Sequence, residues 1–302
     1  MSAALLVPAL LLDAAFGEPH WLWSRLPHPA VVMGRAVGWL DARLNRGENR
    51  KAKGVLALLV LVLGAGLAGA AIASLPDGGL LEVLAAAILL AQRSLVDHVR
   101  AVGDALRLSL SDGRRMVARI VGRDTSALDE AGVARAAIES AAENLSDGVV
   151  APALAFLVFG LPGLMIYKIT NTADSMIGHR TARHEQFGWA AARFDDLLNW
   201  IPARLTAALI LLAHGRFDPA PVLRDGPLHR SPNAGWPEAA MAVVLDVALS
   251  GPRSYNGVIT AFPWVWPEGR ADPGPDQIDA ACTALWRAWA GLLGLACLVA
   301  LV

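Results

Sequence analysis

The sequence predicts an all-α protein that crosses a membrane several times, on the basis of its composition, one long apolar run and the distribution of its basic residues. Of the 302 residues, 55% are hydrophobic and 18% are charged. Soluble domains are on average about half apolar and a quarter charged. Residues Gly54–Leu75 contain no charged side chain. A helix of this length is about 33 Å long, enough to cross a hydrocarbon core of roughly 30 Å.

Six apolar segments are candidates for membrane helices, and we expect about four to six crossings. These segments are Ala3–Phe16, Gly54–Leu75, Leu80–Ala91, Gly148–Tyr167, Trp200–Ala213 and Ala284–Val302. A seventh, Ala239–Leu249, is short and contains Asp246, so it predicts a packed or interfacial helix. No basic residue precedes the first segment, which predicts a membrane helix rather than a cleaved signal. We expect residues 1–302 to form a single integral-membrane domain.

The basic residues predict the orientation, because Lys and Arg accumulate on the cytoplasmic side of membrane helices. Residues 35–53 contain six of them and residues 92–147 contain eight arginines, whereas the connection Pro76–Gly79 has none. We therefore expect the first two stretches inside the cell and Pro76–Gly79 outside. This arrangement predicts a multi-pass protein of a bacterial-type inner membrane, with its active face in the cytoplasm.

The segment Gly148–Tyr167 contains a strong turn signal, Gly-Leu-Pro-Gly at Gly160–Gly163. A single crossing here would put the basic stretch Lys168–Asn199 outside the cell. A re-entrant hairpin over residues 148–167 would return the chain to the cytoplasm, and we favour this interpretation.

The two cysteines form no Cys-x-x-Cys motif, so they predict neither a zinc site nor a disulfide framework. The net charge of −1 argues against a nucleic-acid partner.

Three carboxylates occur at helical spacing just before this apolar segment. Glu139, Glu143 and Asp147 lie at i, i+4 and i+8, and each step drifts by only about 40° around a helix, so they share one face. Asn144 lies beside them. Like charges on one stripe repel one another unless a cation neutralises them, and Mg²⁺ prefers carboxylate oxygens. The stripe predicts a Mg²⁺ site, with a solvated helix face as the alternative.

Two further polar elements follow the same apolar segment. Residues 168–180 carry three residues on one helix face, namely Asn171, Asp174 and Gly178. Residues 191–205 carry four polar candidates, namely Arg193, Asp195, Asp196 and Asn199. Ionisable groups at a membrane face are functional candidates, although capped helix ends and snorkelling charges are the alternative. A turn at Ser231–Asn233 then precedes a helix beginning at Pro237, an arrangement that can bind phosphate. Together these elements predict a Mg²⁺-dependent membrane enzyme that acts on a phosphate-bearing substrate.

The chain resembles the adenosylcobinamide-phosphate synthase family of cobalamin biosynthesis, called CobD or CbiB. The resemblance covers most of the chain and rests on ordered motifs. They are Asp13 with Gly17-Glu18-Pro19, Pro27-His28-Pro29, Gly122-Arg123-Asp124-Thr125, Glu139-Ser140, Glu143-Asn144, Asp147-Gly148, Tyr167, Asn171-Thr172, Asp174-Ser175, Gly178, Asp195-Asp196, Asn199, Ile201-Pro202-Ala203-Arg204, and Ser231-Pro232-Asn233-Ala234-Gly235-Trp236-Pro237. A modest departure is His179-Arg180, where the family often has a basic residue directly after Gly178.

The resemblance implies ATP-dependent amide formation. The free propionate carboxyl of adenosylcobyric acid would join (R)-1-amino-2-propanol or its O-phosphate, giving adenosylcobinamide or its phosphate. It implies Mg²⁺ and ATP as cofactors, the corrinoid and the amine as substrates, the lipid bilayer as surroundings, and other corrinoid-pathway membrane enzymes as partners.

Within this reaction we assign roles to the polar residues. The catalytic candidates are Glu143, Asn144, Asp174 and Asp195, and the metal ligands are Glu139, Glu143, Asp147 and Asp174. The substrate-binding candidates are Arg123, Asp124, Asn171, Thr172, Ser175, Arg193, Asp196, Asn199, Arg204, Ser231 and Asn233. Alternative functions are a Mg²⁺-dependent membrane prenyl- or phosphatidyl-transferase, a non-catalytic membrane regulator on the same fold, and a transporter.

Overall fold

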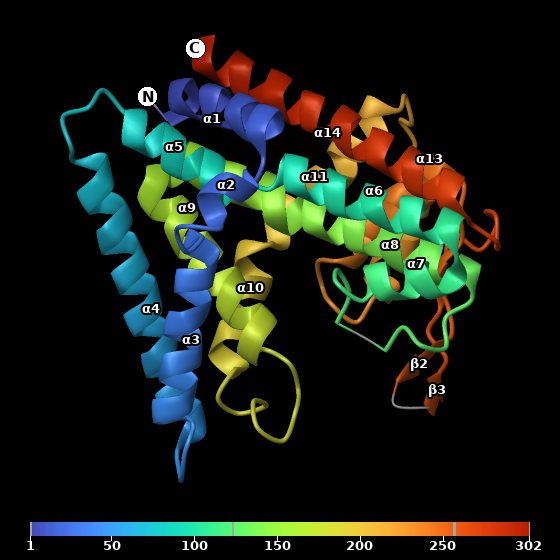
Figure 1. Cartoon of the computed structure of the whole chain (residues 1–302), viewed down its shortest axis with the longest axis horizontal. Coiled ribbons are helices and arrows are strands. Elements are labelled where there is room, and N and C mark those ends of the chain that lie inside the picture. The colour runs from blue at the N-terminus through green and yellow to red at the C-terminus, as the bar shows by residue number, and fades with distance from the viewer. Residues whose placement is uncertain (1, 123, 256–257, 302) are drawn as a thin grey trace. The chain divides into compact units, whose positions relative to one another are not determined.

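The computed structural model describes residues 2–122, 124–255 and 258–301, and the all-α fold class is confirmed. The helices are α1 (Ser2–Phe16), α2 (His20–Trp23), α3 (Pro29–Leu44), α4 (Arg50–Ala73), α5 (Leu80–Leu89), α6 (Gln92–Leu108), α7 (Leu110–Val117), α8 (Glu130–Leu145), α9 (Ala151–Ile177), α10 (Trp189–Leu198), α11 (Trp200–Ala213), α12 (Ala220–Asp225), α13 (Gly235–Leu245) and α14 (Pro275–Leu301) (Figure 1). A π-helical turn, Ser146–Val150, joins α8 to α9, and a 3₁₀ turn, Gly226–Leu228, follows α12.

Four short strands, which the sequence did not predict, form two antiparallel pairs. Strand β1 (Leu249–Ser250) pairs with β4 (Trp264–Val265), and β2 (Arg253–Tyr255) pairs with β3 (Val258–Thr260). The predicted helix Ala239–Leu249 is confirmed as a packed element, α13, but it begins and ends earlier. It ends at Leu245 because Asp246 adopts a left-handed backbone conformation with φ 52°.

Three helical stretches in the described residues are long and apolar enough to cross a membrane: Arg50–Ala73, Glu130–Ile177 and Pro275–Leu301. The bent pair α10 and α11 makes a fourth if it forms one span. The predicted range of four to six crossings is therefore met only at its lower end. The segments beginning at Ala3 and Leu80 form helices of 15 and 10 residues. These are about 22 and 15 Å long, short of the roughly 30 Å hydrocarbon core.

The chain forms two compact units. Unit 1 comprises the described residues of 1–91, 151–199 and 295–302, and unit 2 comprises those of 92–150 and 200–294. The sequence-based expectation of one domain over residues 1–302 stays a prediction.

In unit 1, α9 packs against α1, α3, α4, α5 and α10. Helix α4 approaches it closely through Gly69, where a Cβ atom would lie 2.7 Å from the Cα of Pro162. The predicted turn is present as a kink inside α9 at Gly160, with φ 65° and ψ −160°. Glycine adopts this conformation without the steric penalty that other residues incur. The side of the membrane to which the second half of α9 returns stays a prediction.

In unit 2, α8 packs against α6, α7 and α13. Its small side chains, including Ala134, Ala137 and Ala141, are fully buried, and this allows neighbouring helices to approach closely. Helix α13 is buried through Ala239–Val243. The polar residues of α8 and α13 therefore lie on helices that the apolar core of unit 2 holds in place.

Candidate functional site

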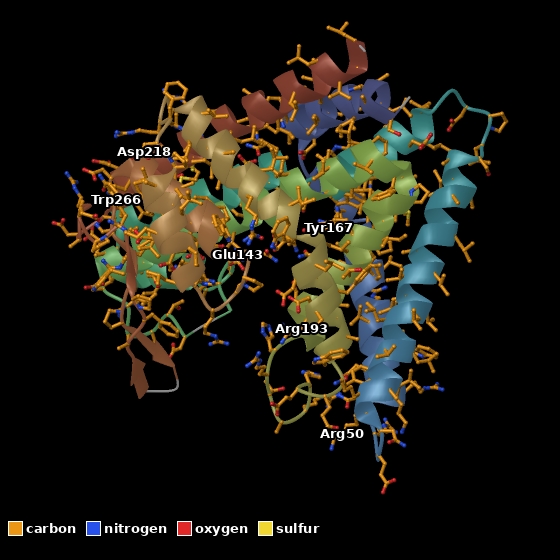
Figure 2. All side chains as sticks on the ribbon, turned by 180° about the vertical axis from the view of Figure 1, so that it is seen from behind. Arg50, Glu143, Tyr167, Arg193, Asp218 and Trp266 are labelled. Atoms are coloured by element: carbon orange, nitrogen blue, oxygen red, sulfur yellow. The ribbon has the colours of Figure 1, made fainter. Side chains whose placement is uncertain are left out.

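A buried polar cluster in unit 1 connects α9 to α10. Its members are Tyr167, Asn171, Asp195 and Asn199. The Asp195 side chain accepts a hydrogen bond at Oδ1 from Asn171 Nδ2, at 3.3 Å, and another at Oδ2 from Asn199 Nδ2, at 2.9 Å. Asp195 is 8% exposed and Asn199 is 1% exposed. Figure 2 labels Tyr167 on α9 and Arg193 on α10, the two helices that supply the cluster. We call these four residues the Asp195 cluster.

Tyr167 fixes the orientation of one of these donors. Its hydroxyl donates to Asn199 Oδ1 at 2.9 Å, so the amide nitrogen of Asn199 is directed toward Asp195. Buried polar groups are normally hydrogen-bonded because an unpaired one carries a desolvation cost. The result is a carboxylate with one donor on each oxygen and a locked orientation. Each of its oxygens keeps a second lone pair that can accept a proton.

Other charged groups surround the Asp195 cluster within Coulombic range. Asp174 and Asp196 are negative neighbours of Asp195, and Arg193 lies 3.5 Å from Asp196. Asp174 is half-buried, whereas Ser175 is exposed. The Thr172 hydroxyl donates to the backbone carbonyl of Lys168 and is therefore engaged within its own helix.

Two basic residues that sequence reasoning did not assign to the site, His179 and Arg180, lie in the connection between α9 and α10. His179 is a Coulombic neighbour of Asp174, and Arg180 is one of Asp196. The ends of this connection meet, since a Cβ atom on Gly188 would lie 1.6 Å from the carbonyl oxygen of Ile177. The sequence feature that could have indicated these two residues is their position directly after Gly178.

A second missed contact anchors the same connection to α3. Asp41 accepts hydrogen bonds from Arg183 Nη2 at 2.5 Å and from Asn45 Nδ2 at 2.8 Å. Asn45 also donates to the Arg183 carbonyl at 3.1 Å. Burial raises the pKa of the Asp41 carboxyl, but the hydrogen bonds from Asn45 and Arg183 together lower it by more. The pKa of this carboxyl therefore lies below its ordinary value. The connection between α9 and α10 is thereby held in one position.

The predicted carboxylate stripe belongs to unit 2, and its members have different surroundings. Glu139 is buried, and its Oε1 accepts a hydrogen bond from the backbone nitrogen of Ser250 at 2.7 Å. Glu143, labelled in Figure 2, is exposed, and Asp147 is half-buried. A π-helical turn begins at Ser146, so Asp147 leaves the α-helical register on which the shared face depended. In the described part of the chain, no three His, Cys, Asp or Glu side chains are arranged to hold a metal ion.

Two predicted site residues of α8 have partners of their own. Glu139 anchors Ser250, which lies in β1, and its assignment as a metal ligand stays a prediction. Asn144 donates from Nδ2 back to the carbonyl and hydroxyl oxygens of Ser140, so it stabilises its own helix. Glu143 and Asp147 remain as candidates.

The predicted substrate-binding residues Arg204, Ser231 and Asn233 also lie in unit 2, and the structure places them in contact. Arg204 Nη1 donates to Asn233 Oδ1 at 3.0 Å, and its guanidinium lies 4.7 Å from the ring centroid of Trp200 and 4.5 Å from that of Trp236. The Ser231 hydroxyl accepts from the backbone nitrogens of Asn233 and Ala234. Those two amides are thus already bonded and do not form the phosphate-binding turn that the sequence predicted.

Two predicted substrate-binding residues, Arg123 and Asp124, are neighbours in the sequence. Arg123 is outside the described residues. Asp124 is exposed and accepts a hydrogen bond from the backbone nitrogen of Ser126, which holds the pKa of its carboxyl below the ordinary value. Within the described part of the chain, the Asp124 carboxylate accepts from the Ser126 amide and the Thr125 hydroxyl donates to the Arg114 carbonyl, and neither partner is a predicted site residue.

Comparison with known proteins decides the family. The family model described as CobD/Cbib protein matches residues 6–285. The chain belongs to the CobD/CbiB family. It is 50% identical to the cobalamin biosynthesis protein CobD of Sinorhizobium fredii and 51% identical to that of Rhizobium meliloti, in each case over 94% of this chain and 92% of the relative. It is 46% identical to the CobD protein of Rhodobacter capsulatus, over 99% of this chain and 98% of the relative. No solved structure matches the chain significantly.

Membership of the CobD/CbiB family confirms the resemblance inferred from the motifs. The family match covers both the Asp195 cluster and the carboxylates of α8. It does not assign a role to any of these residues.

Proposed function

We propose that the protein is a carbon–nitrogen ligase of cobalamin biosynthesis. It joins the free propionate carboxyl of adenosylcobyric acid to (R)-1-amino-2-propanol or its O-phosphate, in a reaction driven by ATP. The family supports the pathway, and the Asp195 cluster is the structural observation that supports the chemistry. The inner membrane and a cytoplasmic active face belong to the same proposal and rest on the distribution of Lys and Arg.

The reaction makes two demands on the protein. A carboxylate is a poor electrophile and must first be activated by ATP, as an acyl phosphate or an acyl adenylate. The amine must then lose a proton as its nitrogen forms the new bond to the carboxyl carbon and the phosphate or AMP leaves. We assign acceptance of that proton to Asp195. A general base contributes typically 10²–10⁴-fold to a rate when it is correctly placed.

Asn171 and Asn199 are positioning residues in this assignment. Each donates to one oxygen of Asp195, and Tyr167 locks Asn199 in turn. The carboxylate therefore presents its remaining lone pairs in a fixed direction before the amine arrives. Such preorganisation lowers the barrier because no reorientation is needed during the reaction.

Mg²⁺ fits the two carboxylates of the stripe that are not fully buried, Glu143 and Asp147. The ion typically binds one or two carboxylates and completes its shell with waters and substrate phosphate oxygens, so a complete protein cage is not required. Glu143 and Asp147 are the candidate ligands in unit 2, and Asp174 is the separate candidate in unit 1. When bound, the ion would neutralise charge on the transferred phosphoryl group.

The arginines divide into two kinds. The Arg204 guanidinium donates to three oxygens, those of Trp200, Pro232 and Asn233, and stacks between two indoles, so we assign it to positioning the start of α13. Arg193 is exposed and makes one long contact, of 3.5 Å, with Asp196. It is therefore a better candidate than Arg204 to bind a phosphate. An arginine that binds phosphate normally does so through two parallel N–H donors.

The experiment measures amide product from adenosylcobyric acid, ATP, Mg²⁺ and either amine, using the purified protein in lipid nanodiscs. We expect Asp195→Asn to reduce product formation at least a hundredfold. The matched control is Asp97→Asn, which removes an exposed carboxylate paired with Arg93 in unit 2 and should leave the rate unchanged. Absence of any product from the wild-type protein with both amines contradicts the proposed reaction. An active Asp195→Asn variant moves the base elsewhere.

A genetic test is independent of purification. A strain lacking this gene should grow on cobinamide but not on cobyric acid where cobalamin is required. Growth on cobyric acid alone contradicts the proposal, because the step after cobyric acid would then be intact.

A further inference from the structure

An apolar groove lies between α3, α4 and α9 in unit 1. Its lining includes Val32 and Trp39 from α3, Val60 and Gly64 from α4, and Met165 and Ile169 from α9. Its volume is about 550 Å³, within the roughly 300–1,000 Å³ of typical small-molecule sites. Every one of these side chains is apolar apart from the indole nitrogen of Trp39.

One end of the groove is basic. Helices α3 and α4 run side by side and join at a turn, near Arg50 in Figure 2. Residues 43–53 around this turn contain five cations and one acidic residue, namely Arg43, Arg46, Glu48, Arg50, Lys51 and Lys53. The Arg43 guanidinium lies 5.2 Å from the ring centroid of Trp39, which itself lines the groove. The cationic surface is therefore continuous with the apolar one.

Two tryptophans mark the level at which a membrane interface would lie. Trp39 is 57% exposed, and Trp189 is exposed with Lys51 Nζ 3.8 Å from its ring centroid. Tryptophan is enriched at the boundary between headgroups and hydrocarbon, and clusters of Lys and Arg beside a membrane helix attract anionic lipids.

The groove extends from the basic turn to about the middle of a bilayer. Along α3 it runs from Leu40 to Val32, about 5 to 17 Å from Arg43 at 1.5 Å per residue. Along α4 it runs from Val60 to Ala65, about 14 to 21 Å from Lys51. Half of a roughly 30 Å hydrocarbon core is about 15 Å, so the α3 side spans one leaflet and the α4 side lies near the bilayer midplane. The outer face of α4 beside the groove also exposes Leu56, Leu59 and Leu63, as a lipid-facing helix does.

We propose that this groove binds one anionic phospholipid, with an acyl chain between α3, α4 and α9 and the phosphate on the basic turn at residues 43–53. The positive charge of the turn favours an anionic lipid, since a zwitterionic lipid has no net negative charge and the apolar face of a second copy has no charge to pair with the cations. The inference is independent of the proposed reaction, and its test needs no catalytic activity.

Gly64 provides a direct test. A Cβ atom at Gly64 meets nothing within 4 Å and Gly64 lines the groove, so the side chain of Gly64→Leu enters the groove. Gly294→Leu is the matched control, because Gly294 lies in α14, outside the groove, and has equally open space. Both changes replace glycine with a stronger helix former, so both variants should fold. Thermal unfolding checks this for each.

The measurement is native mass spectrometry of the full chain after exposure to mixed vesicles of phosphatidylglycerol and phosphatidylcholine. We expect the wild-type protein and Gly294→Leu to retain one phosphatidylglycerol, and Gly64→Leu to lose it. The double variant Arg43→Gln/Lys51→Gln should lose at least tenfold in preference for phosphatidylglycerol, since each cation contributes about fivefold. Arg119→Gln/Arg216→Gln, which removes two exposed arginines of unit 2, should keep the preference.

Several results would overturn the proposal. Equal lipid retention by Gly64→Leu and the wild-type protein removes the groove as the site. An unchanged preference in Arg43→Gln/Lys51→Gln removes the headgroup contact. A dimer that Gly64→Leu dissociates would make the groove a subunit interface, and displacement of the lipid by inorganic phosphate alone would make the turn a simple anion site.

Discussion

The Tyr167 hydroxyl donates a hydrogen bond to the side-chain carbonyl of Asn199 at 2.9 Å, and this contact determines which end of the Asn199 amide faces Asp195. Without it, the amide can rotate by 180° and present its oxygen to the carboxylate. Two acceptors would then face each other in a buried site, which is unfavourable. Tyr167 therefore acts on Asp195 through Asn199 and is a positioning residue.

We predict that Tyr167→Phe lowers kcat by about fivefold while leaving KM for the amine unchanged, because one hydrogen bond is worth about 1 kcal/mol. Thr206→Val is the control, since it removes a buried hydroxyl that donates only to the Pro202 carbonyl of its own helix. The two variants should have similar thermal stability, so that only catalysis separates them. Equal activity of Tyr167→Phe and the wild-type enzyme would leave the contact a purely structural one.

A second prediction concerns stability in acid and rests on Asp225 in unit 2. Asp225 is buried and accepts hydrogen bonds from Arg224, at 2.7 and 2.8 Å, and from the backbone nitrogen of Trp266, at 2.8 Å. Burial raises the pKa of this carboxyl, but the hydrogen bonds from Arg224 and the Trp266 amide together lower it by more. The pKa therefore lies below its ordinary value. Figure 2 labels Trp266, whose loop these contacts hold against α12.

A depressed carboxyl pKa contributes stability that is complete above the unfolded-state pKa, about 4, and is lost as the pH falls through the folded-state value. We therefore expect the Tm of the protein to fall below about pH 4. In Asp225→Asn the Tm should be lower at neutral pH and should fall less on acidification. The control is Asp218→Asn, an exposed neighbour whose carboxylate caps the Ala220 amide. Parallel pH profiles for Asp225→Asn and the wild-type protein would contradict the assignment.

The third prediction tests the membrane topology by labelling single cysteines with an impermeant reagent added outside the cell. Ser126→Cys and Gln186→Cys, in a background lacking Cys282 and Cys297, should both be shielded, and Pro76→Cys should be labelled. Ser126, Gln186 and Pro76 are all exposed on the folded protein, so protection from the reagent reports the side of the membrane rather than burial. External labelling of Gln186→Cys alone would make Gly148–Tyr167 a simple span and rule out the hairpin.

Local features of the fold were predictable because they depend on short stretches of sequence. The uncharged run in α4 and the Gly-Leu-Pro-Gly signal that became the kink at Gly160 are examples. The short helices α1 and α5 were predicted correctly as apolar helices, but they are shorter than the roughly 30 Å hydrocarbon core. An apolar pattern indicates a buried or lipid-facing helix, whereas a crossing also depends on where the helix ends.

The site was predictable in its residues but not in its pairings. Asn171 and Asp195 were assigned as parts of separate elements, and only the packing of α9 on α10 brings them together. Glu139 is paired with Ser250, which is 111 residues away in sequence, so helical spacing alone could not distinguish it from Glu143. The π-helical turn at Ser146 likewise follows from tertiary packing, since no local pattern in this stretch marks it.

The last prediction separates the members of the carboxylate stripe. Glu143→Gln and Asp147→Asn keep the shape of each side chain and remove one charge that a bound Mg²⁺ needs. We expect each to lower product formation by roughly a hundredfold and to raise the Mg²⁺ concentration required, as loss of a preorganised charge contact does. Both variants should remain folded in the membrane, because neither carboxylate is fully buried.

Glu139→Gln should behave in the opposite way. Its carboxylate is buried against the Ser250 amide, and Ser250 adopts a left-handed backbone conformation with φ 63° that this hydrogen bond helps to hold. Hydrogen bonds to charged groups contribute about 1.5–3 kcal/mol, so the Tm of unit 2 should fall while the Mg²⁺ dependence of the remaining activity stays normal. If Glu139→Gln instead raises the Mg²⁺ requirement at unchanged stability, Glu139 is a ligand after all. Normal turnover and unchanged Mg²⁺ dependence in Glu143→Gln and Asp147→Asn would make the stripe a scaffold and shift the metal to Asp174 in unit 1.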